Sequence, residues 1–151
     1  MNTTRMGNIG EKIECFTEQD ALGEVNIWML PFFKPAHVNG MLGESFSSYG
    51  EAAKALLEKG VQRVFLSMGS DGMYAATADT QLWMDNIPGS MVNTTGCGDA
   101  AMAALVWAWM NDLSLKETVQ AGLAAGAIAM ESSETINPAM SVTALKLRMS
   151  E

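Results

Sequence analysis

The sequence predicts an α/β fold, with a central and largely parallel sheet flanked by helices. Short runs of β-branched and aromatic residues alternate along the chain with longer helix-forming segments, and glycine-containing turns separate them. Of the 151 residues, 48% are hydrophobic and 17% are charged. This composition supplies a packed core and excludes an intrinsically disordered chain. We expect one domain over residues 1–151.

The charge balance limits the classes of partner. Seventeen acidic against nine basic residues give a net charge of −8, which disfavours nonspecific binding to nucleic acid or to an anionic membrane. The longest apolar stretch, residues 100–110, is shorter than the roughly 20 residues of a membrane-spanning helix, and residues 1–12 lack the apolar part of a signal peptide. We expect a cytoplasmic protein. Cys15 and Cys97 form no CxxC unit, so we expect two free thiols and neither a disulfide nor a zinc site.

The first half of the chain predicts one strand and one helix. Near the N-terminus, a helix over residues 10–16 is an open possibility. Residues 24–30 are β-branched and apolar and are followed by prolines, which predicts a short buried strand. Ser48 precedes Glu51 at the spacing of a capping box, so a helix is expected to begin there and to end at Gly60.

The middle of the chain is rich in strand signals. Residues 61–68 predict another buried strand that leads into the glycine-bearing turn 69–72. Residues 73–77 and 82–87 predict two further short strands, with the polar turn 78–81 between them.

The remainder of the chain predicts three helices. Residues 93–110 pass from small loop residues into an apolar run without a polar stripe, so that helix is expected to be central and buried nearly all round. Ser114 and Glu117 repeat the capping-box spacing and open a helix to residue 130, whose small residues permit close packing. Ser141 predicts the start of a last amphipathic helix.

The segment 93–101, NTTGCGDAA, is the strongest candidate for chemistry. Gly96, Cys97 and Gly98 lead directly into a helix, and glycines let bare backbone amides approach a ligand. Unpaired amides at a helix N-terminus attract negative charge, which makes this segment a candidate anion cradle. Asp99, in the first turn, either takes a proton from an attacking hydroxyl or only complements the helix dipole, which is worth about 0.3–1 kcal/mol. The residues alone leave both readings open.

Four segments carry a resemblance to one family. NTTGCGDAAMAAL, residues 93–105, is similar to the second signature of the ribokinase-like (PfkB-type) carbohydrate kinases. FKPAHVNGMLG resembles the family's Lys-Pro-Asn-x-x-Glu segment, SMGSDGMYA resembles its glycine turn over the nucleotide phosphates, and SSETINPAMS resembles its C-terminal nucleotide-side loop. The asparagine at position 93 looks most like the pseudouridine-kinase branch. The resemblance extends over residues 28–140.

The resemblance implies a role for each matching residue. Asp99 would deprotonate the acceptor hydroxyl of a sugar or nucleoside, and the backbone amides of Gly96, Cys97 and Gly98 would stabilise charge on the transferring phosphoryl group. ATP and Mg²⁺ are the implied cofactors. Six further residues would bind the nucleotide, the first three beside its phosphates and the others toward adenosine: Ser67, Gly69, Gly72, Leu123, Gly126 and Asn137.

Alternatives from the residues themselves stay open for the adenosine side. Gly126 is equally explained by close packing between helices, and Asn137 by a turn before Pro138.

The sequence also departs from the family pattern. Asn39 stands where the family has the glutamate that organises magnesium-bound water, and Asn93 stands where it has an aspartate associated with a monovalent cation. His37 is interpreted as an ordinary loop residue, so no protein metal site is predicted. The family's N-terminal half, with its sugar-binding residues and β-sheet lid, has no counterpart here.

We therefore expect the C-terminal half of a ribokinase-like fold, acting as an ATP-dependent phosphotransferase on a sugar or nucleoside such as pseudouridine. A homodimer is expected, because a half-fold exposes apolar surface and the 13 methionines adapt readily to a new contact. One alternative is a catalytically silent nucleotide-binding or oligomerising remnant, and another is a structural domain with an empty cradle. The phosphate acceptor itself is left open.

Overall fold

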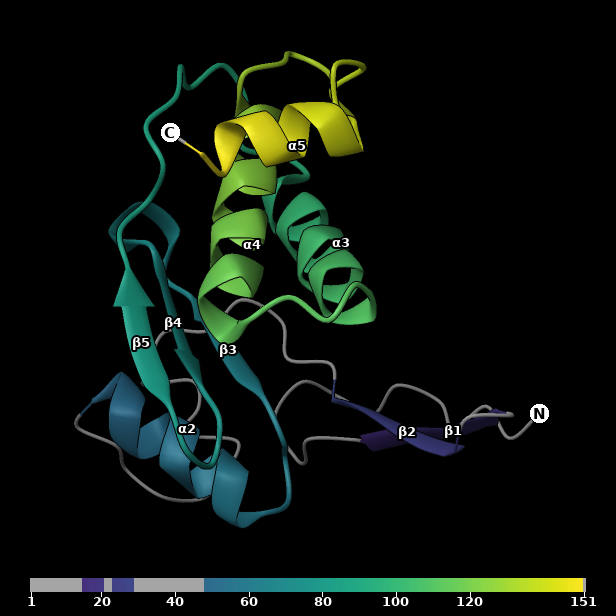
Figure 1. Cartoon of the computed structure of the whole chain (residues 1–151). Coiled ribbons are helices and arrows are strands. Elements are labelled where there is room, and N and C mark those ends of the chain that lie inside the picture. The colour runs from purple at the N-terminus through teal and green to yellow at the C-terminus, as the bar shows by residue number, and fades with distance from the viewer. Residues whose placement is uncertain (1–14, 21–22, 29–47, 151) are drawn as a thin grey trace.

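Figure 1 shows the computed structural model of the chain, which describes residues 15–20, 23–28 and 48–150. Strands β1 (Cys15–Asp20) and β2 (Gly23–Trp28) pair as an antiparallel hairpin. The rest of the described chain forms one sheet, four helices and a 3-10 turn at Gly69–Asp71. The strands of the sheet are β3 (Val64–Ser67), β4 (Met73–Ala76) and β5 (Gln81–Met84). The helices are α2 (Tyr49–Glu58), α3 (Cys97–Met110), α4 (Leu115–Met130) and α5 (Val142–Arg148).

The predicted α/β class is confirmed, but the strands of the described sheet are not parallel. They lie in the order β3-β4-β5, and both neighbouring pairs are antiparallel. The reason is the length of the connections, since residues 68–72 and 77–80 form tight turns, whereas a parallel pair needs a crossover of a dozen residues or more. The expectation of a largely parallel sheet is wrong for the described strands.

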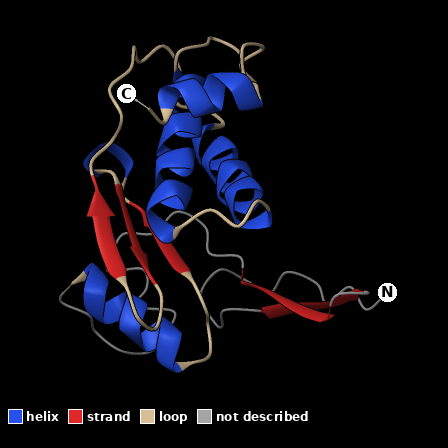
Figure 2. Ribbon diagram, in the orientation of Figure 1, coloured by secondary structure: helices blue, strands red, loops and turns tan. Residues whose placement is uncertain are grey.

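Helices cover both faces of this sheet, as Figures 1 and 2 show. Along β4, Met73 and Ala75 join the apolar cluster shared with α3 and α4, while Ala76 joins the cluster shared with α2, and Tyr74 packs against it. This alternation is the two-residue period of a strand, and it buries both faces. The result is three layers, with α5 packed against α4.

Most predicted elements occur where the sequence places them. The strand predicted over 24–30 is β2, and the strands predicted over 61–68, 73–77 and 82–87 are β3, β4 and β5 with shorter bounds. β1 was not predicted, and of the possible helix over residues 10–16 the described Cys15 and Phe16 belong to that strand.

The helix ends follow the predicted capping residues. The Ser48 hydroxyl accepts from the Glu51 amide at 3.2 Å, and Ser141 caps α5 in the same way through the Ala144 amide at 3.1 Å. Gly60 lies just past α2 with a φ of +97°, which suits a glycine at a helix end.

The central helix is α4, not α3. Ten of the sixteen residues of α4 are buried, because it lies between the sheet and two other helices. Of the fourteen residues of α3, only Ala104, Leu105 and Ala108 are buried. The prediction that the helix within 93–110 is buried nearly all round is therefore wrong, since an all-apolar sequence does not by itself supply the elements that would cover it. Among the described helices, none has the length and hydrophobicity to cross a membrane.

Candidate functional site

Helix α3 begins in a backbone conformation that requires glycine. Gly96 is its N-cap residue and has a φ of +85°. A Cβ atom placed on Gly96 would lie 2.5 Å from the carbonyl oxygen of Thr135, closer than any real contact of that kind. The glycine therefore lets the chain turn left-handed and pass directly beside the 131–136 segment.

The first turn of α3 is open. No side chain caps the helix, and among the described residues the amides of Gly98 and Asp99 have no hydrogen-bond acceptor. A Cβ on Gly98 would meet nothing within 4 Å, so a ligand has room to approach the backbone. Free amides at the positive end of a helix dipole are suited to an anionic group such as a phosphate.

Asp99 lies in the same turn and is exposed. Its carboxylate makes no hydrogen bond or ion pair with the described residues. The geometry thus leaves this carboxylate available to accept a proton beside the cradle.

Cys97 is half-buried at the first position of α3, and its Sγ lies 3.9 Å from the Asn93 carbonyl oxygen. Burial raises the pKa of this thiol, against a smaller opposing effect of a backbone hydrogen bond. The Cys97 backbone amide donates to the Thr94 carbonyl oxygen at 3.3 Å, so its action on a phosphoryl group stays a prediction.

Asn93 connects the cradle to the end of α4. Its Nδ2 donates to the Ser133 carbonyl oxygen at 3.2 Å, and its Oδ1 accepts from the Thr95 amide at 3.0 Å. The resemblance implies a monovalent cation near this position. The residues present do not fit one, because a hydrogen-bond donor rather than a carboxylate faces the carbonyl oxygen.

Sequence reasoning missed the carbonyls of Ser133 and Thr135 as partners of the cradle. The only available signal was the resemblance of residues 132–141 to a nucleotide-side loop, which gives no contact.

The predicted phosphate-side residues lie on the turn that joins β3 to β4, at the upper end of the sheet in Figure 1. Ser67 is exposed at the end of β3, and Gly69 has a φ of +61°. Gly72 is buried with a φ of +97°, and a Cβ there would overlap the Met84 carbonyl oxygen. Asn86 closes the turn by donating to the Gly69 carbonyl oxygen at 2.6 Å. No hydrogen bond among the described residues joins this turn to the 93–99 segment.

The three predicted adenosine-side residues differ from one another. Leu123 is only 6% exposed and packs in the core, so its nucleotide role stays a prediction. Gly126 is half-buried, and a Cβ there would make an ordinary 3.8 Å contact with the Cys97 carbonyl oxygen, next to the cradle. The tightly packed glycine of α4 is instead Gly122, where a Cβ would lie 3.0 Å from Leu105.

Asn137 has a structural use of its own. Its Nδ2 donates to the Ile128 carbonyl oxygen at the end of α4 at 2.6 Å, and its Oδ1 accepts from the Ala139 amide at 2.9 Å. These contacts support the turn alternative, and contact with adenosine stays a prediction.

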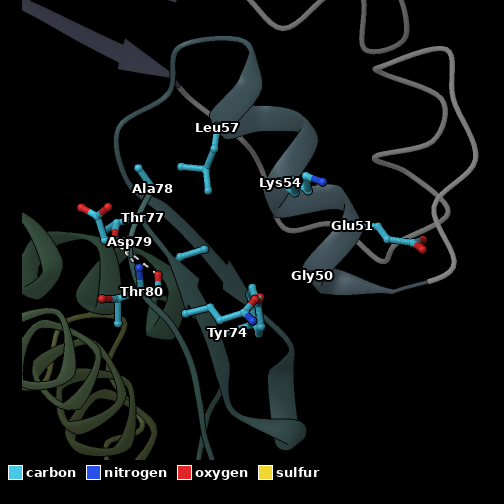
Figure 3. Close-up of a pocket in the computed structure, with 11 residues that line it drawn as sticks. Gly50, Glu51, Lys54, Leu57, Tyr74, Thr77, Ala78, Asp79 and Thr80 are labelled. Carbon is cyan, nitrogen blue, oxygen red and sulfur yellow. Dashed lines mark hydrogen bonds between the residues drawn. The ribbon is translucent and has the colours of Figure 1, made fainter.

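Two hollows in the described surface lie away from all of these residues. One, of about 480 Å³, opens between α2 and the β4–β5 turn, where Figure 3 shows Lys54, Tyr74 and Asp79 among its lining residues. The other, of about 540 Å³, lies between the C-terminal end of α3, α4 and α5 and includes Trp107, whose ring centroid is 6.0 Å from Lys146 Nζ. Neither is lined by a predicted site residue.

The residues that the structure describes contain no group of three or more histidine, cysteine, aspartate or glutamate side chains able to hold a metal ion. His37 and Asn39 lie outside the described residues, so the structure leaves their interpretation as it was.

Sequence comparison relates most of the chain to one family of carbohydrate kinases. The family model described as pfkB family carbohydrate kinase matches residues 36–142. The chain is 25% identical over 130 residues to a pseudouridine kinase of Escherichia coli, covering 85% of this chain and 42% of that protein. It is 33% identical over 113 residues to a 1-phosphofructokinase of Bacillus subtilis, covering 70% of this chain and 37% of that protein. The chain thus spans less than half the length of these relatives.

Solved structures share the fold. A putative sugar kinase from Clostridium perfringens has a TM-score of 0.70 at 21% identity, covering 77% of this chain and 38% of that one. Phosphofructokinase-2 from Escherichia coli, solved in complex with potassium, has a TM-score of 0.66 at 21% identity, covering 76% and 38%. Arabidopsis thaliana ribokinase, solved with ribose and ATP, has a TM-score of 0.66 at 19% identity, covering 78% and 39%. The predicted ribokinase-like fold is thereby confirmed.

Proposed function

Because the chain belongs to the pfkB family of carbohydrate kinases, we propose that it takes part in ATP-dependent phosphoryl transfer to a hydroxyl group of a sugar or nucleoside. The observation that carries this proposal is the start of α3, where an uncapped, glycine-built helix end lies beside an exposed carboxylate. Pseudouridine is one candidate acceptor, since a relative bears that name, and a phosphorylated hexose is another, since a second relative is a 1-phosphofructokinase.

In the proposed reaction the acceptor oxygen attacks the γ-phosphorus of ATP in line. A new oxygen–phosphorus bond forms as the bond to the β–γ bridging oxygen breaks, and ADP leaves with that electron pair. Asp99 accepts the proton of the attacking hydroxyl, because its carboxylate is exposed in the same helical turn as the cradle amides. The amides of Gly98 and Asp99, which have no acceptor among the described residues, donate to the negative oxygens of the phosphoryl group.

The turn of residues 67–72 and the adenosine-side residues complete the proposed nucleotide site. Gly126 is the best supported of the latter, because it lies beside Cys97 and is not tightly packed. Mg²⁺ would arrive with the triphosphate and neutralise part of its charge, with no dedicated cluster from the described residues. The use of ATP favours the cytoplasm as the compartment.

We also propose that the chain self-associates, with a homodimer as the simplest assembly. Met102, Val106 and Trp109 follow one another at helical spacing on α3, and each is about half exposed. Adjacent Met110 is 74% exposed. Apolar side chains gathered on one helix face are typical of a contact surface. Light scattering over a range of concentrations tests this, and a monomer at all concentrations would contradict it.

A catalytically silent nucleotide-binding or oligomerising role is the second candidate. It is favoured by Asn39 and Asn93, which replace two carboxylates of the family pattern, and by the same exposed face of α3. The kinase and the silent nucleotide-binding module require nucleotide binding, whereas an oligomerising remnant or a structural domain with an empty cradle does not.

Calorimetric titration with ATP and Mg²⁺, followed by an ADP-release assay with pseudouridine and with ribose, separates the three. Binding with turnover supports the kinase, and binding without turnover for any acceptor supports the silent module. Absence of both heat and thermal stabilisation at millimolar ATP would eliminate both nucleotide hypotheses.

A further inference from the structure

Asn93 lies at the contact between the segment that leads into α3 and the end of α4. Its backbone amide donates to the Met130 carbonyl oxygen at 3.1 Å, and its side-chain Nδ2 donates to the Ser133 carbonyl oxygen at 3.2 Å. Three residues further on, Gly96 passes so close to Thr135 that no Cβ fits. The cradle segment is therefore held against the 130–135 segment, with Asn93 as its side-chain link.

The orientation of the Asn93 amide is fixed by its two partners. The Thr95 backbone amide is a donor and points at the side chain at 3.0 Å, so the atom that receives it must be the oxygen. The nitrogen then faces Ser133, whose carbonyl oxygen accepts. Exchanging the two atoms would set donor against donor and acceptor against acceptor.

We propose that Asn93 is a positioning residue that fixes the cradle without a monovalent cation. An aspartate in its place would bring a negatively charged oxygen against the Ser133 carbonyl oxygen with no proton between them. Such a pair repels unless a cation lies between the two oxygens. The asparagine supplies a covalently attached N–H at that point, so it performs the bridging that a potassium ion would perform for a carboxylate.

Two consequences follow for the chain and its variants. The wild-type protein is indifferent to potassium, and the Asn93→Asp variant acquires a dependence on it. The hydrogen bond from Asn93 to Ser133 belongs to the fold itself, so the melting temperature of the protein measures its contribution. Its effect on ATP binding rests on the proposed function, because that step assumes that residues 96–99 hold the phosphates.

The experiment measures melting temperatures of the full chain in potassium chloride and in choline chloride at equal ionic strength. Asn93→Asp is expected to melt a few degrees below wild type in choline and to recover most of the loss in about 100 mM potassium, because an ion that binds only the folded state stabilises it. Wild type is expected to melt at the same temperature in both salts. Asn93→Ala is expected to lose stability equally in both, since it offers the ion no ligand.

Asn111→Asp is the matched control. The Asn111 Nδ2 also donates to a backbone carbonyl oxygen, that of Trp107 at 2.8 Å, but this residue is exposed at the far end of α3. Its carboxylate can turn into water, so no potassium effect is expected.

Potassium stabilisation of wild type, or an Asn93→Asp variant that melts alike in both salts, would overturn the proposal. A variant that stays unfolded even in potassium would count against it equally. Calorimetry then measures the affinity for ATP in the same two salts. In choline, Asn93→Asp is expected to bind ATP about tenfold more weakly than wild type, and in potassium its affinity is expected to recover. If wild type binds no ATP, the proposed function fails, while the melting temperatures still decide the role of Asn93.

Discussion

Helices α3 and α4 pack against each other, yet one begins with an open end and the other with a closed one. At α4, the Ser114 hydroxyl accepts from the Glu117 amide at 3.3 Å, and the Glu117 carboxylate accepts from the Ser114 amide at 2.9 Å. At α3, Gly96 offers no side chain, and the described residues leave the amides of Gly98 and Asp99 without acceptors. The capping box pairs the first amides of α4 within the protein, whereas the start of α3 leaves two amides available for the proposed phosphate.

The same contrast extends along the two helices. α4 buries ten of its residues and forms the centre of the fold, while α3 leaves Met102, Val106 and Trp109 about half exposed. Under the proposed function, α4 serves mainly stability and α3 mainly binding. Substitutions at the two helix starts should therefore affect different measurements.

The largest expected effect is on catalysis at the open end. Asp99→Asn keeps the size of the side chain but removes the proton acceptor, which should lower any phosphotransfer rate by about 100- to 10,000-fold while ATP binding survives. An ADP-release assay and calorimetry measure the two quantities. Asp112→Asn is the control, because it changes the net charge equally at the other end of α3 and its φ of +56° suits asparagine. Equal turnover of wild type and Asp99→Asn would disprove the catalytic role.

The next effect is on binding at the same end. A Cβ on Gly98 meets no protein atom, so Gly98→Ala should leave the free energy of unfolding within about 0.5 kcal/mol of wild type. The added methyl group would hold a phosphate away from the amides and weaken ATP binding about tenfold. Calorimetry and urea unfolding test both expectations.

Gly50→Ala is the matched control for this change. Gly50 holds the same second position in α2, where the Ser48 side chain already caps the helix end. A Cβ there would lie 3.4 Å from the Tyr74 hydroxyl, and ATP binding should be unchanged. If both variants bind ATP like wild type, the cradle is not the phosphate site.

A smaller effect is expected at the closed end. Ser114→Ala removes the cap of α4 and should lower the free energy of unfolding by about 1 kcal/mol, measured in urea, with ATP affinity unchanged. Ser90→Ala serves as control, because the exposed Ser90 side chain makes no hydrogen bond with described residues. A loss of ATP binding in Ser114→Ala would contradict the division of roles between the two helices.

The smallest effect is the pH dependence of that cap. Hydrogen bonds from the Ser114 hydroxyl and, second, from its backbone amide hold the pKa of Glu117 below its ordinary value of 4.5. A carboxyl group whose pKa is lower in the folded state adds stability that is complete above 4.5 and is lost as the pH falls through the folded pKa.

The stability difference between wild type and Ser114→Ala should therefore shrink on acidification below 4.5. In a Glu117→Gln background this part of the pH dependence should vanish. A difference between wild type and Ser114→Ala that grows on acidification would contradict the assignment.

Local features of the fold could be predicted because their causes are local. Ser48, Ser114 and Ser141 each cap a helix through the amide three residues ahead, and three residues of sequence contain that whole interaction. The antiparallel order of β3, β4 and β5 follows from the short turns at 68–72 and 77–80, whereas the alternation of strands and helices along the chain is more typical of a parallel sheet.

Some features of the candidate site follow from neighbouring residues in the sequence, and others depend on how the helices pack. The grouping of Gly96, Gly98 and Asp99 in one helical turn follows from their adjacency in the sequence. The position of Gly126 beside Cys97, rather than in the tight contact made by Gly122, depends on how α3 and α4 pack. The roles of Leu123 and Asn137 toward adenosine stay predictions.

By itself, the sequence determined where the helices begin, which glycines permit the turns, and the chemical character of the cradle, because backbone sterics and capping act over a few residues. Only the tertiary structure decided that α4 is central, that α3 keeps an exposed apolar face, and that the Asn93 amide meets a carbonyl 40 residues away. The physical reason is that burial and long-range hydrogen bonds depend on which surfaces meet. A hydrophobic pattern states that a surface can be buried, but it does not name the partner that covers it.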